Sequence, residues 1–424
     1  MSYEETLGYL AQTAMMGSRL GLSRMRELLT KLGNPQQQLK FVHIAGTNGK
    51  GSTAAMLTAV LRQAGYRTGL YTSPHLLRYE ERFQIDGREV SQADFTAATA
   101  RVKAEADTME DGPTQFELLT CVALCIFQAA HCAIVVLEVG LGGRLDATNV
   151  ISVPEVAVIT RIGLEHTEIL GDTVEQIAAE KAGIIKPGGC VVLGDQTEAV
   201  RGVVADICRK NDAHLTTVPL DELQFLSGSL QGQHFAWRQY PDVLLPLLGR
   251  HQLQNACTAL ETVEQLRRRG WRISDSAVLS GLGKTVWPGR FECVSQHPAL
   301  IIDGGHNRQC AEALAAALRD YFPGKKIIFL IGVLADKDFT GIFDALLPLA
   351  KQVAAVTPDS PRALGAAALC ARLQQQYAFT AATPCACVGD GLALVQKAAH
   401  RDDVICVCGS LYMIGEVRSL LHLR

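Results

Sequence analysis

The sequence lacks any apolar run of the roughly 18–20 residues that a membrane helix requires. Its start, MSYEETLGYL, has no basic region followed by an apolar core, which is the pattern of a secretory signal. The formal net charge is −3, so there is no excess positive charge to attract nucleic acid or an acidic membrane surface. These absences predict a cytoplasmic protein with neither nucleic acid nor membrane as a partner.

Paired C-x-x-C motifs at zinc spacing are also absent, although the chain has 13 cysteines. An odd number cannot all form disulfides within one chain, and some cysteines lie in apolar runs, such as Cys121 and Cys125 in CVALCIF. Free cysteine is among the most buried residue types, so we expect reduced cysteines packed in the core. Metal chelation by Cys385 and Cys387 is the alternative.

The chain does contain apolar strand-like runs that alternate with helical patterns, which predicts an α/β fold with mainly parallel sheets. At 424 residues, two domains are expected rather than one. One helix should open at a glycine loop and end near Gly65, and another should begin at TQFE, where Thr114 and Glu117 have capping-box spacing. In the first half, strands are predicted near 41–45, 68–72, 132–139 and 156–161.

A second alternating series predicts a small doubly wound domain of its own. It starts at PALIIDGGHN and continues through KIIFLIGVL, QVAAVTP, TPCACVG and DDVICVCGS, each followed by a helical pattern. Residues 212–250 resemble hairpins more than strand–helix units. The join is best placed in KTVWPGRFE, Lys284 to Glu292, because proline and glycine interrupt both periodicities there. We therefore expect domains at residues 1–287 and 288–424.

The stretch FVHIAGTNGKGSTAAML, residues 41–57, resembles a phosphate-binding loop with altered spacing. The usual pattern is G-x-x-x-x-G-K-[ST], but here Gly51 follows Lys50, and Ser52 is the first hydroxyl after the lysine. Glycines let the backbone approach an anion, amides at the helix start point toward it, and the lysine adds charge. A glycine-rich turn that binds nothing is the alternative, and no N-K-x-D guanine signature accompanies the loop.

Polar residues at the ends of two other predicted strands are candidates for metal binding. Glu138 ends the strand in AIVVLEVGLGGRLDATN, and ligands bind at the carboxyl ends of strands in such folds. A carboxylate near a phosphate loop is suited to hold magnesium, although an exposed strand end is the alternative. His166 follows another strand, and Lys181 lies on a helix begun near Thr173. Taken alone, these two residues indicate an ordinary loop histidine and a solvated lysine.

A set of motifs extends these observations along the chain: HIAGTNGKGST, YTSPHLLRYEERF, LEVGLGGRLDATN, LEHTEILGDTVEQIAAEKAGIIKPG, WPGRFE, IIDGGHN and CGSLYMIGEV. Their order and spacing resemble folylpolyglutamate synthase and dihydrofolate synthase of the Mur ligase superfamily, from about residue 3 to the C-terminus. Gly51 resembles this family's version of the loop. The resemblance implies an N-terminal P-loop-type ATPase domain with a mainly parallel sheet, and a smaller Rossmann-like C-terminal domain that serves as the glutamate ligase domain.

The resemblance also implies an activity. ATP would phosphorylate a carboxylate of a folate or pteroate substrate, and the amine of L-glutamate would attack the acyl phosphate to give an amide, ADP and phosphate. A carboxylate is a poor acyl donor, so phosphoryl transfer must activate it, and this transfer depends on positioning and charge neutralisation. The family implies a monomer, and the enzyme would add the first glutamate to dihydropteroate, extend folate chains, or do both.

Site residues follow from the same resemblance, with Lys50, Glu138, His166 and Lys181 as the catalytic set. ATP would lie in the cleft between the domains, held by Thr47, Asn48, Gly49, Lys50, Gly51, Ser52, Asn255, Arg290, Asp303 and His306. Two magnesium ions would be held by Ser73, Glu138, His166 and Lys181. Lys181 matches a lysine that is carbamylated in the family, where an ammonium beside two dications would be repelled. The substrates would be contacted by Arg82, Phe116, Arg144, Asp146 and Ser410, with Phe116 stacking on the pterin.

Three positions depart from the family pattern: Arg161, Glu165 and Gly305. Of these, Arg161 would change the charge near the metal site. Two other functions compete with the ligase. A sister ligase would join an amino acid to a cell-wall nucleotide precursor, but the inserted Gly51 and the missing α/β unit before residue 41 disfavour it. A nucleotide switch without ligase activity is disfavoured by the residues for a second metal ion, which a switch does not need.

Overall fold

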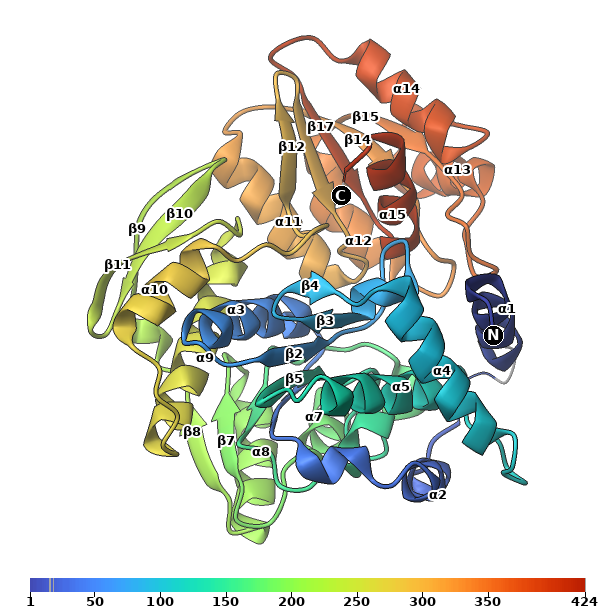
Figure 1. The fold of residues 1–424 in the computed structure, drawn as a ribbon. Coiled ribbons are helices and arrows are strands. Elements are labelled where there is room, and N and C mark those ends of the chain that lie inside the picture. The colour runs from blue at the N-terminus through green and yellow to red at the C-terminus, as the bar shows by residue number, and fades with distance from the viewer. Residues whose placement is uncertain (15–16, 18, 424) are drawn as a thin grey trace. The chain divides into compact units, whose positions relative to one another are not determined.

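The computed structural model describes residues 1–14, 17 and 19–423, and the chain divides into two compact units (Figure 1). Unit 1 comprises Met1–Gln224, Ala236–Leu244 and Gln254–Thr285. Unit 2 comprises Phe225–Phe235, Leu245–Leu253 and Val286–Arg424. Each unit contains a mainly parallel sheet with helices, so the predicted α/β class is confirmed. Among the described residues, every helix is too short or too polar to cross a membrane.

Unit 1 is built on an eight-stranded sheet in the order β4-β3-β2-β5-β1-β6-β7-β8. Neighbours from β2 to β8 pair in parallel, whereas β3 and β4 add an antiparallel edge. The central strands are buried and rich in Val and Ile, as expected where both faces of a parallel sheet are covered. The strands are β1 (Phe41–Ala45), β2 (Thr68–Tyr71), β3 (Phe83–Ile85), β4 (Arg88–Glu89), β5 (Ile134–Glu138), β6 (Val156–Ile159), β7 (Cys190–Leu193) and β8 (His214–Thr217).

Helices cover both faces of this sheet. Helices α2, α4 and α5 pack over β1, β2 and β5 in one apolar cluster, and α7 and α8 pack over β6 and β7 in another. Helix α3 lies on the opposite face from α5 (Figure 1), as right-handed crossovers require when the chain reverses direction across a sheet. The helices are α1 (Tyr3–Ala14), α2 (Ser23–Lys31), α3 (Lys50–Gln63), α4 (Gln92–Ala106), α5 (Gln115–Ala129), α6 (Thr167–Leu170), α7 (Val174–Ala182), α8 (Glu198–Lys210), most of α9 (Arg250–Arg268) and α10 (Asp275–Gly283).

Capping boxes start two of the helices whose beginnings were predicted. The Thr114 hydroxyl accepts a hydrogen bond from the Glu117 amide, and the Glu117 carboxylate accepts one from the Thr114 amide. Thr173 and Gln176 form the same reciprocal pair at the start of α7. Each box satisfies two amides that a helix start otherwise leaves without partners. Both predicted starts are confirmed.

Unit 2 has a six-stranded sheet in the order β12-β13-β17-β14-β15-β16, which is parallel except between β12 and β13. Helices α11, α12 and α13 pack on one face, and α14 and α15 contact β14 and β17. The predicted Rossmann-like domain is confirmed. Its elements are β12 (Glu292–Gln296), β13 (Ala299–Asp303), α11 (Arg308–Tyr321), β14 (Ile327–Ile331), α12 (Phe339–Leu346), β15 (Ala350–Ala355), α13 (Ala366–Tyr377), β16 (Ala382–Pro384), α14 (Val388–Ala398), β17 (Val404–Cys408) and α15 (Leu411–Leu420).

The segment predicted to form hairpins contains a separate three-stranded sheet. It consists of β9 (Leu223–Ser229), β10 (Gly232–Trp237) and β11 (Tyr240–Leu245) in the order β11-β10-β9. The strand β8 precedes it and belongs to the large sheet of unit 1. The strand predicted at TPCACVG is also displaced, because β16 ends at Pro384 and Cys387 caps α14 instead.

The cysteines are free thiols in the described part of the chain. Cys121 and Cys125 lie on the buried face of α5 within its apolar cluster, as predicted. Cys387 accepts a hydrogen bond from the Asp390 amide at the start of α14, and the Cys385 thiol donates to the Thr383 carbonyl. No cluster of three or more His, Cys, Asp or Glu suited to a metal ion occurs in the described ranges. Within the described residues, Cys385 and Cys387 therefore lack a third His, Cys, Asp or Glu ligand with which to chelate a metal ion.

Candidate active site

The carboxyl ends of neighbouring strands gather many of the predicted site residues of unit 1 at one edge of its sheet. Strand β5 lies between β2 and β1, with Leu137 opposite Tyr71 and Glu138 opposite Ile44. Strand β6 lies on the other side of β1. All four strands are parallel, so the segments that follow them meet at the edge where ligands bind in open α/β sheets. These segments carry Ser73 after β2, residues 46–52 after β1, Glu138 at the end of β5 and His166 after β6.

The glycine loop is held by the segment that follows β6. The Arg161 carbonyl accepts hydrogen bonds from the amides of Thr47 (2.9 Å) and Asn48 (3.1 Å). The Thr47 hydroxyl also exchanges hydrogen bonds of 3.1 Å with the Gly163 backbone. The amides of Thr47 and Asn48 are therefore engaged within the protein. The amides in the first turn of α3, from Lys50 onward, are the ones placed to meet an anion.

Gly49 lies close to the side chain of Asn255 in α9. A Cβ atom at Gly49 would lie 2.4 Å from Asn255 Oδ1, and its φ of 86° is in the left-handed region that favours glycine. Both residues were predicted to contact the nucleotide from distant parts of the sequence. The structure brings them together.

Charged groups converge around this loop. Lys50 Nζ lies 3.9 Å from Glu138 Oε1, and the Ser73 amide lies 3.4 Å from Glu138 Oε2. Lys181 Nζ donates a 2.9 Å hydrogen bond to the Gly46 carbonyl. Glu138 and Lys181 are each only 5% exposed. The structure therefore excludes an exposed strand end for Glu138 and a solvated lysine for Lys181.

The buried position of Lys181 changes its protonation. Desolvation, reinforced by the positive charge of Lys50, lowers the pKa of Lys181 to about 7, although Glu165 and Asp146 oppose the shift. A solvated lysine has a pKa near 10.4. The Lys181 amine is therefore uncharged in a large fraction of molecules at neutral pH.

His166 and Arg161 have other partners. His166 precedes α6 with a φ of 53°, and its Nδ1 lies 3.9 Å from the Glu168 carboxylate. Its side chain is 37% exposed, unlike Glu138 and Lys181. The Arg161 guanidinium pairs with Asp195. The departure from the family pattern at Arg161 therefore brings its own neutralising carboxylate.

Two predicted substrate contacts, Arg82 and Phe116, belong to one aromatic group. Arg82 Nε donates a 2.9 Å hydrogen bond to His75 Nδ1, and the guanidinium lies 5.7 Å from the centre of the Tyr79 ring. The Tyr79 hydroxyl accepts a 2.9 Å hydrogen bond from Gln115, the neighbour of Phe116. Desolvation and the Arg82 charge lower the pKa of His75 to about 3, so its ring is neutral and carries its proton on Nε2. Sequence analysis did not single out His75, although a titratable residue directly follows the proline of TSPH.

Two other predicted contacts, Arg144 and Asp146, stabilise the loop between β5 and β6. Asp146 is 4% exposed and accepts hydrogen bonds from the amides of Leu141 (2.8 Å) and Thr148 (3.0 Å) and from the Thr148 hydroxyl. Burial raises the pKa of Asp146. Arg144 Nη2 lies 2.8 Å from Glu180, the neighbour of Lys181. Both residues therefore have structural partners at this loop.

His43 of β1 extends this network into the sheet and gives a pH prediction. Its Nε2 lies 2.9 Å from the Thr148 hydroxyl, which donates to Asp146, so Nε2 carries the proton. Burial lowers the pKa of His43 to about 3, below the value of about 6.5 in an unfolded chain. The unfolded state therefore binds more protons between these values, and His43 makes stability fall with falling pH by at most about 1.4 kcal/mol per unit. The free energy of unfolding, measured by urea denaturation between pH 7 and 5, should change less with pH in His43→Gln than in the wild type. An equal pH dependence in the two proteins would contradict the assignment.

In unit 2, predicted nucleotide contacts gather at the end of β13. Asp303 accepts hydrogen bonds from the amides of Phe291 (2.9 Å) and Gly305 (2.8 Å). Arg290 Nη1 lies so close to Gly304 that a Cβ atom there would be only 2.5 Å away. The Asp303 carboxylate thus ties the WPGRFE motif to the DGGHN motif.

Two histidines accompany this group. His306 Nδ1 lies 3.0 Å from the Gly304 carbonyl and carries the proton, because a carbonyl only accepts. His251, at the start of α9, was missed by sequence analysis. Burial lowers the pKa of His251, and the nearby charges of Asp303 and Arg290 act on this pKa in opposite directions. A histidine in GRHQLQN, four residues before Asn255, was the available signal.

Ser410 stands at the start of α15 with an unusual hydroxyl. It is 2% exposed, and its oxygen has no hydrogen-bond partner among the described residues. Buried hydroxyls normally have such a partner. The predicted glutamate contact is therefore a buried polar atom that a ligand could satisfy.

Comparisons with known proteins identify the family of this chain. Residues 44–263 match the Mur ligase middle domain, and residues 289–411 match the Mur ligase, glutamate ligase domain. A dihydrofolate synthase/folylpolyglutamate synthase of Bacillus subtilis (strain 168) is 33% identical over 437 residues, covering 99% of each chain. The chain belongs to the folylpolyglutamate synthase and dihydrofolate synthase family.

Solved structures of this family share the fold. Mycobacterium tuberculosis folylpolyglutamate synthase complexed with ADP is 32% identical, with a TM-score of 0.91 and full coverage of both chains. A bifunctional folylpolyglutamate synthase/dihydrofolate synthase with Mn, AMPPNP and L-glutamate bound is 34% identical, with a TM-score of 0.86. That match covers 99% of this chain and 98% of the other. The family resemblance found in the motifs therefore extends over the whole fold.

Proposed function

We propose that this chain is an ATP-dependent ligase that couples L-glutamate to a carboxylate of a folate or pteroate substrate. The observation that carries this function is the edge of the unit 1 sheet, where the glycine loop, Lys50, buried Glu138 and buried Lys181 meet in a member of this family. The relative that holds AMPPNP, Mn and L-glutamate supports a triphosphate, a divalent metal and glutamate as ligands.

The chemistry proceeds in two transfers. A substrate carboxylate oxygen bonds to the γ-phosphorus of ATP, and the bond to ADP breaks. The uncharged amine of glutamate then bonds to the acyl carbon, phosphate leaves, and the amine loses a proton. Lys50 and the first-turn amides of α3 oppose the phosphate charge, which is the main demand of phosphoryl transfer.

The residues beside the loop suit a divalent cation. Glu138 supplies carboxylate oxygens and Ser73 a hydroxyl, and magnesium prefers oxygen ligands and bridges substrate phosphates. When bound, magnesium would neutralise phosphate charge. We assign two ions to Ser73, Glu138, His166 and a carbamylated Lys181. The burial of Lys181 near Lys50 supports the carbamate, because carbamylation converts the lysine side chain into an anion that Lys50 attracts.

The remaining assignments divide between the two predicted domains. We assign ATP binding and the pterin site to residues 1–287, with Arg82, Phe116, Arg144 and Asp146 toward the pterin substrate. Residues 288–424 would serve as the glutamate ligase domain. There, Arg290, Asp303 and His306 would contact the nucleotide, and the unmatched hydroxyl of Ser410 supports a glutamate contact.

A phosphate-release assay with each component omitted in turn tests the function. We expect ADP and an enzyme-bound acyl phosphate from ATP and the pterin substrate, with sustained release only when L-glutamate is present. The rate should rise toward alkaline pH, because glutamate's ammonium must lose a proton to attack. Dihydropteroate and tetrahydrofolate, offered separately with product mass spectrometry, would distinguish first addition from chain extension. Equal release without a pterin substrate would indicate an ATPase or switch, and release driven by a cell-wall nucleotide would indicate a sister ligase.

A further inference from the structure

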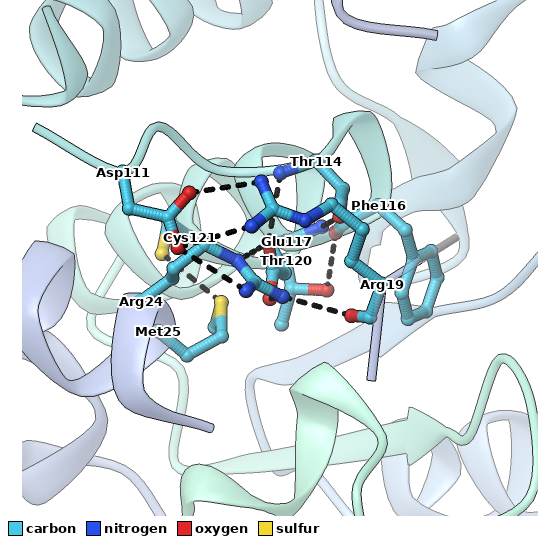
Figure 2. A network of polar contacts seen from close by, with 9 residues as sticks. All are labelled: Arg19, Arg24, Met25, Asp111, Thr114, Phe116, Glu117, Thr120 and Cys121. Atoms are coloured by element: carbon cyan, nitrogen blue, oxygen red, sulfur yellow. Dashed lines mark hydrogen bonds and ion pairs between the residues drawn. The ribbon is translucent and has the colours of Figure 1, made fainter. Parts of the chain in front are cut away.

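A buried ion pair joins α2 to the first turn of α5 (Figure 2). Arg24 binds Glu117 through two hydrogen bonds, from Nε to Oε2 (3.0 Å) and from Nη2 to Oε1 (2.9 Å). The two side chains are 8% and 4% exposed. Arg24 also donates to the Arg19 carbonyl (2.8 Å), and Arg19 pairs with Asp111 nearer the surface. Arg24 Nη1 also lies 3.5 Å from Asp111. Arg24 therefore links α2, and the segments before α2 and α5, to the start of α5.

Glu117 has a second role in the same helical turn. Its carboxylate accepts a 2.7 Å hydrogen bond from the Thr114 amide and so completes the capping box. One carboxylate thus serves both the helix start and the ion pair. The same helical turn carries Phe116. Its ring packs against Gly140, because a Cβ atom at Gly140 would lie 2.3 Å from Phe116 Cζ. The Phe116 side chain remains half-buried rather than enclosed.

The Arg24–Glu117 ion pair is not expected to add much to the stability of the fold. Desolvation offsets much of the attraction in a buried ion pair, and replacing both partners by uncharged residues is often neutral or stabilising. A bidentate arginine–carboxylate pair does fix the relative orientation of its two elements. The capping box forms between Thr114 and Glu117 without Arg24. The contribution of Arg24 is therefore to fix the position of this turn relative to α2.

We propose that Arg24 is a positioning residue for the pterin-binding surface, which acts through Glu117 to fix the orientation of the Phe116 ring. The inference rests on the proposed function, in which Phe116 stacks on the pterin. Aromatic stacking depends on ring offset and tilt, so a small shift of the α5 turn weakens the contact with the pterin. Lys50 and Glu138 lie on other elements, and binding of ATP should be unaffected.

The test compares two variants by their KM values and melting temperatures. Arg24→Met leaves Glu117 buried without its partner, so we expect a lower melting temperature. Arg24→Met/Glu117→Gln removes both charges while glutamine still completes the capping box, so its melting temperature should return toward that of the wild type. In both variants the KM for the pterin substrate should rise about 10-fold or more, and the KM for ATP should stay within about twofold. A double variant that regains both stability and the wild-type pterin KM would overturn the proposal.

Arg238→Met is a matched control in the same unit. Arg238 lies 2.6 Å from Glu261, which is 1% exposed, and neither residue is a predicted site residue. This variant should lose stability without a selective rise in the pterin KM. A selective rise in Arg238→Met would show that general loosening explains the effect, and would also overturn the proposal. Failure of the proposed function is distinct, because the wild type would then show no pterin-dependent phosphate release.

Discussion

Replacing Lys50 by alanine should lower ligase turnover by about 10²–10³-fold, the usual loss when one preorganised charge-stabilising group is removed. Lys50 Nζ lies 3.2 Å from the Thr47 carbonyl and 3.9 Å from Glu138, so the ammonium is held at the loop by polar contacts. Its contribution is to phosphate charge and not to packing. Steady-state phosphate release gives the turnover, and thermal unfolding should show an intact fold.

Lys40→Ala is the matched control for this prediction. Lys40 directly precedes β1, is 62% exposed in its side chain and pairs with Glu155 at 3.4 Å. Loss of this surface pair should be nearly neutral for stability and turnover. Near-normal turnover in Lys50→Ala would remove the glycine loop from the mechanism.

Replacing Lys181 by alanine should reduce turnover by about 100-fold or more if the residue supports a metal ion. Added acetate or formate should restore part of the activity, because a small carboxylate can supply the oxygens of the lost carbamate. Lys181→Arg should stay inactive, since a guanidinium is not carbamylated and remains positively charged. The rescue ratio is the turnover with about 50 mM added carboxylate divided by the turnover without it.

Lys186→Ala controls for a general effect of carboxylates. Lys186 lies five residues after Lys181, is partly buried and donates a 3.0 Å hydrogen bond to the Asn149 carbonyl. Its variant should show no rescue by acetate or formate. An active Lys181→Arg variant would show that Lys181 is not a metal-supporting residue.

The sequence predicts the fold of this protein well where the signal is local. Alternating apolar runs located the central strands, because buried parallel strands are almost continuously apolar. Thr114 and Glu117 marked a helix start because capping chemistry requires those side chains at that spacing. The strand at TPCACVG was misplaced by a few residues. As the edge strand of its sheet, β16 can be short and end in proline, and apolar content alone does not mark its end.

The contacts that organise the site are less predictable from sequence. The Arg161 carbonyl holds two loop amides, but a backbone acceptor is present in every residue and gives no sequence signature. The Arg24–Glu117 pair joins residues 93 positions apart, and a charged pair that distant has no periodicity. The burial of Lys181 also depends on tertiary packing, because its helix position alone is typical of a solvated lysine.

The attachment of the glycine loop to the segment after β6 also has a consequence for protein synthesis. Thr47 and its partner Gly163 are 116 residues apart, so a ribosome completes the loop long before the segment that anchors it. Until β6 pairs with β1, the emerging chain has the loop sequence but not the Arg161 acceptor that orders its amides. Nucleotide affinity should therefore be acquired only after the segment that follows β6 has been synthesised, and stalled nascent chains ending before residue 156 should not retain ATP.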